Sequence, residues 1–242
     1  MARTPRAAIP ERVEPRLSAN DLALYMVSSD TARMGILRRA KNPIAPPMIR
    51  YRDVRRAITS YLTDATRNLN HLVSAEQMFD QRRGDLSLSN LVRNDAELSI
   101  EVLHSLQRMR NQLSGFDFHP APNEQDKLTI SGVEISVRAD VLVHGSLRGE
   151  QQIGAAILRM TADDATTELA RERRRNIGFY VATLAKMHID QNIISDRTPS
   201  KRLCMSIDIQ HGEVFTAPAA NTRRTNDLES ACSMIAAIWP SI

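Results

Sequence analysis

Four polar side chains with acid–base or metal-binding potential lie along one predicted helix. Their spacing of four, three and four residues places them on a single helix face: Glu97, Glu101, His104 and Arg108. Two like charges four residues apart destabilise a bare helix by roughly 0.2–0.5 kcal/mol, and a bound metal ion or Arg108 could offset that cost. Glu97 and Glu101 are therefore candidate metal ligands.

A further carboxylate, Asp140, lies on the polar side of a predicted strand. From Val133 to His144 apolar side chains alternate with largely polar ones, which is typical of a strand with one buried face. Asp140 and His144 then share the polar face, two pleats apart. One interpretation of Asp140 is structural, as an aspartate paired with Arg138 or another arginine.

Positive charge is concentrated between residues 38 and 56. The formal net charge is only +4, but seven basic residues in this stretch are opposed by Asp53 alone. They are Arg38, Arg39, Lys41, Arg50, Arg52, Arg55 and Arg56. Such a cluster could neutralise nucleic-acid phosphates, or it could be a solvated face paired with acids elsewhere. Because only 4% of the residues are aromatic, we expect backbone contacts rather than base stacking.

The composition is that of a globular protein. The chain has 242 residues, of which 42% are apolar, enough for one domain with a helical appendage or for two small domains. No segment approaches the about 20 uninterrupted apolar residues of a membrane helix, so we expect a cytoplasmic protein without a membrane partner. Cys204 and Cys232 are too few for a disulfide framework and are expected to be reduced core residues.

The N-terminal part divides into a flexible tail and a helical region. Residues 1–17 contain three prolines and little apolar content, which predicts a flexible tail, and residues 18–90 carry helical periodicity. The predicted helices begin at Ser18 or Asn20 and then cover residues 31–41, 54–62, 75–79 and 89–114. Gly115 ends the last one, and residues 116–126 are expected to form a linker.

Residues 91–242 are expected to form an α/β core. Its predicted strands cover residues 127–130, 133–144, 153–160, 201–210 and 213–216. Turns are expected at Ser131-Gly132, at 145–149 and at His211-Gly212. A helix from Asp163 or Asp164 to about Asp190 separates the third and fourth strands, and a final helix carries Trp239 as a packing anchor. The fold class is therefore α+β, with a mixed-sheet core in the order αβββαββα.

This order resembles the core of the PD-(D/E)XK nucleases, the restriction-endonuclease-like fold. The resemblance covers roughly Leu91 to Ile242. In that family a strand hairpin precedes a crossover helix, and the metal site uses an aspartate on one strand and Glu-x-Lys on the next. Here the second strand reads Gly-Ala-Ala-Ile-Leu at 154–158, without the acid and the lysine. The chain also resembles uncharacterised bacterial proteins of similar length.

The resemblance implies that Asp140 is a metal-binding aspartate, because Mg²⁺ prefers carboxylate oxygens. The missing carboxylate could then come from Glu101 or Glu97, or from Glu150 or Gln152. Lys186 or an arginine of the crossover helix could supply the cation. The implied catalytic residues are Asp140, Glu101 and Lys186, and the implied ligands of Mg²⁺, if the protein is active, are Asp140, Glu101 and Glu97.

Three functions are compatible with these features. The first is a nuclease-fold protein with a lost or rebuilt active site that binds nucleic acid or a partner in bacterial DNA maintenance or defence. The second is an active Mg²⁺-dependent deoxyribonuclease, and the third is an interaction module whose basic helices bind an acidic protein. The sequence has no nucleophile elbow, phosphate-binding loop, zinc-protease helix or dinucleotide-binding turn.

Overall fold

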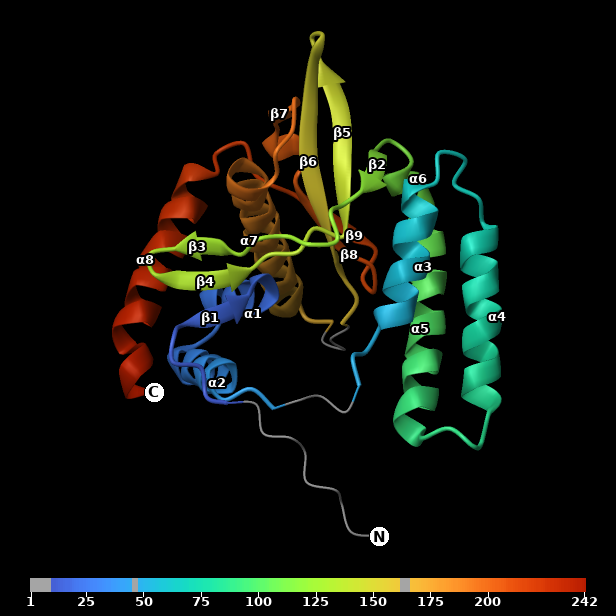
Figure 1. The fold of residues 1–242 in the computed structure, drawn as a ribbon, viewed down its shortest axis with the longest axis horizontal. Coiled ribbons are helices and arrows are strands. Elements are labelled where there is room, and N and C mark those ends of the chain that lie inside the picture. Colours follow the sequence, from blue (N-terminus) through green and yellow to red (C-terminus); the bar gives the residue numbers. More distant parts are fainter. Residues whose placement is uncertain (1–9, 45–47, 162–165) are drawn as a thin grey trace.

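The computed structural model describes residues 10–44, 48–161 and 166–242. It combines helices with two sheets, and each sheet contains both parallel and antiparallel strand pairs (Figure 1). This agrees with the predicted α+β class. None of the helices within these ranges has the length and apolarity of a membrane span.

The larger sheet has the strand order β2-β5-β6-β8-β9, with β7 also paired to β6. Strands β5 and β6 form an antiparallel hairpin, β8 runs parallel to β6, and β9 returns antiparallel to β8. The strand bounds are Asp117–Pro120 (β2), Val141–Leu147 (β5), Glu150–Arg159 (β6), Thr198–Pro199 (β7), Met205–Asp208 (β8) and Glu213–Thr216 (β9). The crossover between β6 and β8 is the long helix α7 (Glu168–Asn192), which packs on both strands.

The smaller sheet has the order β1-β4-β3 and lies among the helices at one side of the molecule. Its strands are Arg16–Ser18 (β1), Leu128–Ile130 (β3) and Val133–Ser136 (β4). The predicted turn at Ser131-Gly132 is confirmed: both residues have positive φ, 45° and 82°, as a two-residue hairpin turn requires.

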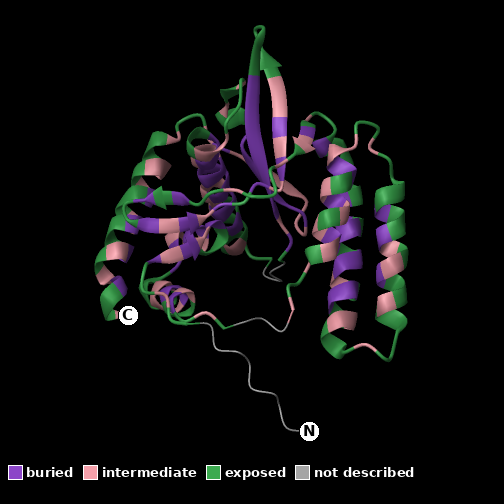
Figure 2. Ribbon diagram, viewed as in Figure 1, coloured by how far each residue is buried: buried purple, intermediate pink, exposed green. Residues whose placement is uncertain are grey.

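Two apolar cores lie on opposite faces of the larger sheet. The first is formed with the smaller sheet and with α1 (Ala19–Met26), α2 (Asp30–Lys41), α7 and α8 (Thr222–Ile238). The second is formed with α3 (Arg52–Thr63), α4 (Asn70–Gly84), α5 (Asn90–Arg108) and the short α6 (Arg110–Leu113). Figure 2 shows buried residues on both sides and an exposed tip of the β5–β6 hairpin. The helices predicted for residues 18–90 are thus divided between the two cores.

Several local predictions are confirmed. Ser18 caps α1 by accepting a hydrogen bond from the backbone of Asp21. Trp239 is buried in the first core. Cys204 and Cys232 are buried free thiols, and burial raises the pKa of each to about 12, so neither is a thiolate at neutral pH.

The prediction of one continuous strand over Val133–His144 is wrong, because two separate strands cover this stretch. β4 ends at Ser136 in the smaller sheet, and β5 begins at Val141 in the larger one. Between them Val137 and Ala139 remain buried, so the alternation of apolar and polar residues continues through the break. Periodicity alone could not reveal the change of sheet, because burial alternates on both sides of it.

The prediction of a flexible tail over residues 1–17 is wrong for residues 10–17, the part of it that the structure describes. Leu17 is buried, and β1 pairs in parallel with β4. Arg12 donates its backbone N–H to Lys41 and accepts a hydrogen bond from Nε1 of Trp239. Long-range pairing therefore orders a segment of low apolar content. Residues 1–9 lie outside the described residues.

Other element boundaries also differ from the predictions. The helix predicted over 75–79 is the longer α4, and the helix predicted over 89–114 ends at Arg108, where Met109 leaves the helical conformation. The predicted linker 116–126 contains strand β2, and the strand predicted over 201–210 starts as a 3₁₀ turn, η1 (Lys201–Leu203). Thr167 caps α7, whereas the predicted caps Asp163 and Asp164 lie outside the described residues.

Candidate functional site

Asp140 lies in a cleft of about 860 Å³. It is lined by α3 along its whole length and the residues before it, by the beginning of α1, by the end of β2 and the loop after it, and by the β4–β5 connection. Ile157 and Leu158 of β6 lie beside Asp140. The cleft therefore joins segments that are far apart in the sequence and belong to both sheets.

Five arginines line this cleft, and Asp140 is the one acidic residue among the described residues that line it. The arginines are Arg50, Arg52, Arg55, Arg56 and Arg138. Within the described parts of the chain, Arg55 alone of the five has an ion-pair partner. The remaining four guanidinium groups leave the cleft strongly positive.

Helix α3 presents its arginines because its opposite side is buried. Val54, Ile58 and Leu62 pack into the second core, and this leaves Arg52, Arg55 and Arg56 on the side of the cleft. Tyr51 directly precedes the helix; its φ of 59° is left-handed, and its backbone N–H donates to the buried Asp95 at 2.9 Å. Burial also raises the pKa of the Tyr51 phenol, with Arg50 opposing the shift, so this group stays protonated at neutral pH.

Arg55 neutralises Asp140. Its Nη1 lies 2.6 and 2.7 Å from the two carboxylate oxygens and 3.2 Å from the carbonyl oxygen of Leu158. The backbone N–H of Leu158 donates to Oδ2 of Asp140 at 2.7 Å. The Asp140 side chain is only 6% exposed, whereas that of Arg55 is 39% exposed. The aspartate is thus paired with an arginine, as its structural interpretation expected, although the partner is Arg55 and not Arg138.

The position of Nη1 is chemically informative. Two carboxylate oxygens and one carbonyl oxygen surround it, and these are the oxygen types that bind hard divalent cations. The next strand contributes Ile157 rather than a second carboxylate. A guanidinium group therefore occupies the place that a metal ion would need beside Asp140.

The other residues predicted for catalysis are placed elsewhere. Glu97 and Glu101 are exposed on α5 and do not line the cleft, and His104 contacts Glu76 of α4. Lys186 forms an ion pair with Asp190, one turn further along α7. Across the described residues, Asp140, Glu97 and Glu101 do not form a group with metal-ligand spacing. The predicted metal and catalytic sets are therefore not assembled.

The predicted basic cluster divides into three parts. Arg50, Arg52, Arg55 and Arg56 line the cleft, whereas Arg38 and Arg39 are exposed on α2 outside it. Lys41 is buried, and its Nζ donates to the backbone oxygens of Trp239 and Ile242 and pairs with Glu11. Lys41 is a structural residue and cannot contact a bound phosphate.

Sequence reasoning did not place Arg138 in the site, although its polar position on the predicted strand was visible. Hydroxyl and amide groups of the cleft were also missed, because they come from separate elements. These are Ser18, Asn20, Thr59, Ser60, Thr63, Asn123 and Ser136. Guanidinium, hydroxyl and amide N–H groups are the donors that proteins use for phosphate oxygens.

No protein-family model and no curated protein sequence matches this chain. Its chemistry must therefore be inferred from the cleft itself. A positive cleft with hydrogen-bond donors can bind an extended or multiply charged anion. The described lining residues include no aromatic side chain.

Proposed function

We propose that the protein binds the sugar-phosphate backbone of nucleic acid in the arginine cleft and has lost metal-dependent cleavage at Asp140. The observation that carries this proposal is the pairing of Arg55 with Asp140. It removes the one carboxylate of the described cleft lining from metal binding and leaves four arginines without ion-pair partners there. The Arg55–Asp140 pair carries no net charge, and those four arginines give the cleft its positive charge.

We also propose that the larger sheet is related to the restriction-endonuclease-like fold. The β5–β6 hairpin precedes the crossover helix α7, and β8 then lies parallel to β6, in the order that the PD-(D/E)XK resemblance implies. Asp140 directly precedes β5 of this hairpin. This relationship supports a nuclease ancestry with a rebuilt site, within bacterial DNA maintenance or defence.

The lining residues favour contacts with phosphates over contacts with bases. Arginine contacts to phosphates release counterions, so affinity falls with salt and depends little on base sequence. If four arginines each contact one phosphate of a single strand, the logarithm of affinity falls with a slope of about −3 against the logarithm of salt. A fourfold rise in salt then weakens binding by about 50-fold.

Fluorescence anisotropy with labelled single-stranded DNA, RNA and duplex DNA, at 50 and 200 mM salt, tests the proposal. We expect salt-sensitive binding to at least one of these nucleic acids, with similar affinity for unrelated base sequences. Arg56→Gln and Arg138→Gln should each weaken binding and make the salt slope shallower by about 0.7 for a single strand. Arg39→Gln is the matched control, because Arg39 is exposed but lies outside the cleft.

Three results would overturn the proposal. The first is binding that Arg39→Gln weakens as much as Arg56→Gln does. The second is displacement of nucleic acid by polyglutamate at equal charge concentration, since the cleft would then recognise acidic proteins. The third is cleavage of plasmid or linear DNA with Mg²⁺ or Mn²⁺ that is lost in Asp140→Ala, which would restore the Mg²⁺-dependent nuclease hypothesis.

A further inference from the structure

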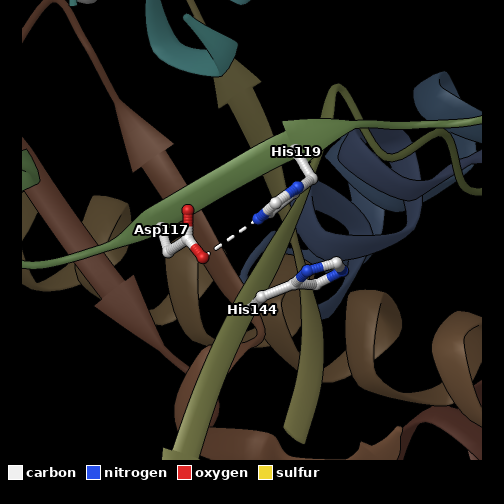
Figure 3. Close-up of side chains that lie close together, drawn as sticks. All are labelled: Asp117, His119 and His144. Carbon is white, nitrogen blue, oxygen red and sulfur yellow. Dashed lines mark ion pairs between the residues drawn. The ribbon is translucent and has the colours of Figure 1, made fainter. Parts of the chain in front are cut away.

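Two histidines and an aspartate gather at the edge of the larger sheet, apart from the residues that line the arginine cleft. Asp117 and His119 lie two residues apart on the edge strand β2, so their side chains project from the same face. Asp117 is paired directly with His144 of β5 in the antiparallel register. Figure 3 shows the three side chains together, with the carboxylate of Asp117 turned toward His119.

The potential ligand atoms of these residues converge. One oxygen of Asp117 and one ring nitrogen from each histidine all lie within 4.8 Å of one another. Nε2 of His119 is 3.0 Å from Oδ2 of Asp117, yet it is a buried atom without a hydrogen-bond partner among the described residues. The two groups are thus close but are not aligned for a hydrogen bond. Zinc–ligand bonds of about 2.0–2.2 Å in tetrahedral geometry separate ligand atoms by roughly 3.3 Å. The 3.0 Å between Nε2 of His119 and Oδ2 of Asp117 is close to that separation.

The imidazole rings of His119 and His144 are stacked, with centroids 3.8 Å apart and planes inclined by 24°. An imidazole nitrogen coordinates through a lone pair in the plane of its ring, so the two side chains would rotate from this stacked position to direct both nitrogens at one ion. Asp117 supplies the negative charge that offsets part of the charge of a bound ion. The arrangement therefore has the donor types and the charge of a metal site.

We propose that Asp117, His119 and His144 bind a divalent transition-metal ion, of which Zn²⁺ is the most suitable. Imidazole nitrogen is a preferred ligand of zinc and its neighbours in the transition series, whereas Mg²⁺ prefers an all-oxygen shell. Three protein ligands leave at least one coordination position open to water or another molecule. This site does not involve Asp140 and does not depend on the proposed function.

A metal ion here would connect the edge strand β2 to β5. β2 ends at Pro120, and the residues from Pro120 to Asn123 form part of the cleft wall. The ion would thereby hold the edge strand at the point where the chain enters that wall. Metal binding would therefore fix the position of β2 beside the cleft, in addition to offering an open coordination position.

Isothermal titration of the untagged, chelator-treated protein with ZnCl₂ tests the site, with MgCl₂ as the second probe. We expect one Zn²⁺ per chain and no binding of Mg²⁺ at the same concentrations. His119→Gln and His144→Gln should weaken zinc binding by at least about tenfold, since even the loss of groups that only orient ligands costs about 10–100-fold. His104→Gln is the control, because His104 is an exposed histidine bound to Glu76.

Asp117→Asn should fold like the wild type, because the Asp117 side chain is 70% exposed. A loss of zinc binding in this variant therefore cannot be attributed to unfolding. Absorption of the Co²⁺-substituted protein should show a low-coordinate cobalt spectrum in the wild type and a changed or absent one in Asp117→Asn. The proposal is overturned if the wild type binds no Zn²⁺. It is also overturned if the histidine and aspartate variants, folded by circular dichroism, bind Zn²⁺ as tightly as the wild type.

Discussion

Gln125 forms hydrogen bonds with both backbone groups of Ala139. Its Oε1 accepts from the backbone N–H, and its Nε2 donates to the carbonyl oxygen, both at 2.9 Å. Ala139 lies where the chain has left the smaller sheet and has not yet joined the larger one, so the side-chain amide replaces a strand partner. Gln125 therefore holds the residue that directly precedes Asp140.

His188 connects this contact to the crossover helix. Its Nε2 lies 3.0 Å from Oε1 of Gln125, and its Nδ1 lies 3.0 Å from Nδ2 of Asn192. Because an amide nitrogen can only donate, Nδ1 accepts and Nε2 carries the proton, which is the neutral form of the ring. Protonation of Nδ1 would break the contact with Asn192.

The first prediction is a loss of stability in mild acid that involves His188. Burial lowers the pKa of His188 below its ordinary value of 6.5, and Asp126 opposes this shift only in part. Below pH 6.5 the unfolded chain binds a proton that the folded chain does not, so stability falls as the pH drops through 6.5 toward the lower folded pKa. Urea denaturation between pH 7.5 and 5 should show this decline.

The test of this prediction is the comparison with His188→Gln, which should have a shallower pH dependence. His144, whose pKa burial also lowers, contributes in the same direction in both proteins, so it does not affect the difference. His104→Gln is the control for removal of an exposed histidine. An unchanged pH dependence in His188→Gln would contradict the prediction.

The second prediction concerns the stability contributed by Asp140. Asp140→Ala should lower the free energy of unfolding by about 2–3 kcal/mol, because it removes charged hydrogen bonds and leaves the N–H of Leu158 without its acceptor. Asp53→Ala is the matched control: Arg82 contacts Asp53 at the same 2.6 Å, but both side chains are 36% exposed. Its cost should be less than about 1 kcal/mol. Equal losses in urea denaturation would contradict this assignment.

The third prediction separates two members of the basic cluster. Lys41→Ala should destabilise the protein by about 2 kcal/mol, because the buried ammonium group binds the backbone oxygens of Trp239 and Ile242. Arg39→Ala, two residues earlier on the same helix, should change stability by less than about 0.5 kcal/mol, since its side chain is exposed. Thermal and urea denaturation measure both. A large loss of stability in Arg39→Ala would contradict the prediction, because it would show that the exposed face of α2 also contributes to packing.

The fourth prediction concerns Gly154, where β6 is approached closely. A Cβ atom at Gly154 would overlap the carbonyl group of Leu203 in η1. Gly154→Ala should therefore destabilise the protein by at least about 2 kcal/mol, as overpacking does when backbone must move. Gly84→Ala, with open space around it at the end of α4, should be neutral or stabilising by up to about 1 kcal/mol. Similar unfolding midpoints for the two variants would contradict the close approach.

The small residues of β6 show how far sequence reasoning reaches. The small side chains of Gly154, Ala155 and Ala156 indicate that another element lies close to this strand, and a close approach exists at Gly154. At Gly154 the approaching element is the 3₁₀ turn η1, and the long helix α7 also packs on β6. A missing side chain indicates that space is needed, but it does not identify the element that fills the space.

The sequence by itself determined the local structure. The face of α3 with Val54, Ile58 and Leu62, the cap at Ser18 and the Ser131-Gly132 turn all follow from interactions within a few residues. Such short-range rules apply wherever the segment lies in the molecule.

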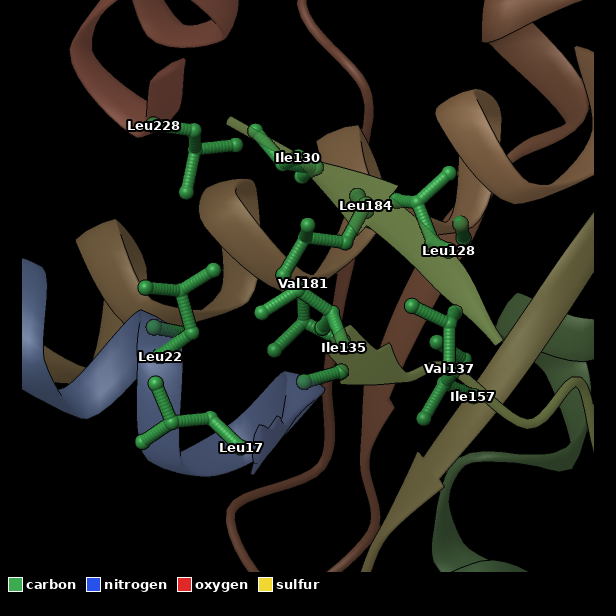
Figure 4. Close-up of a cluster of buried hydrophobic side chains, with 14 of the residues drawn as sticks. Leu17, Leu22, Leu128, Ile130, Ile135, Val137, Ile157, Val181, Leu184 and Leu228 are labelled. Carbon is green, nitrogen blue, oxygen red and sulfur yellow. The ribbon is translucent and has the colours of Figure 1, made fainter. Parts of the chain in front are cut away.

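Tertiary structure alone decided the sites. Arg55 meets Asp140 across 85 residues, and Asp117 meets His144 through strand pairing. The change of sheet before Asp140 was likewise invisible, because Val137 remains buried in the same cluster as Ile157 and preserves the alternation (Figure 4). The physical reason is that periodicity reports whether a side chain is buried, whereas the partner against which it is buried depends on how distant segments pack.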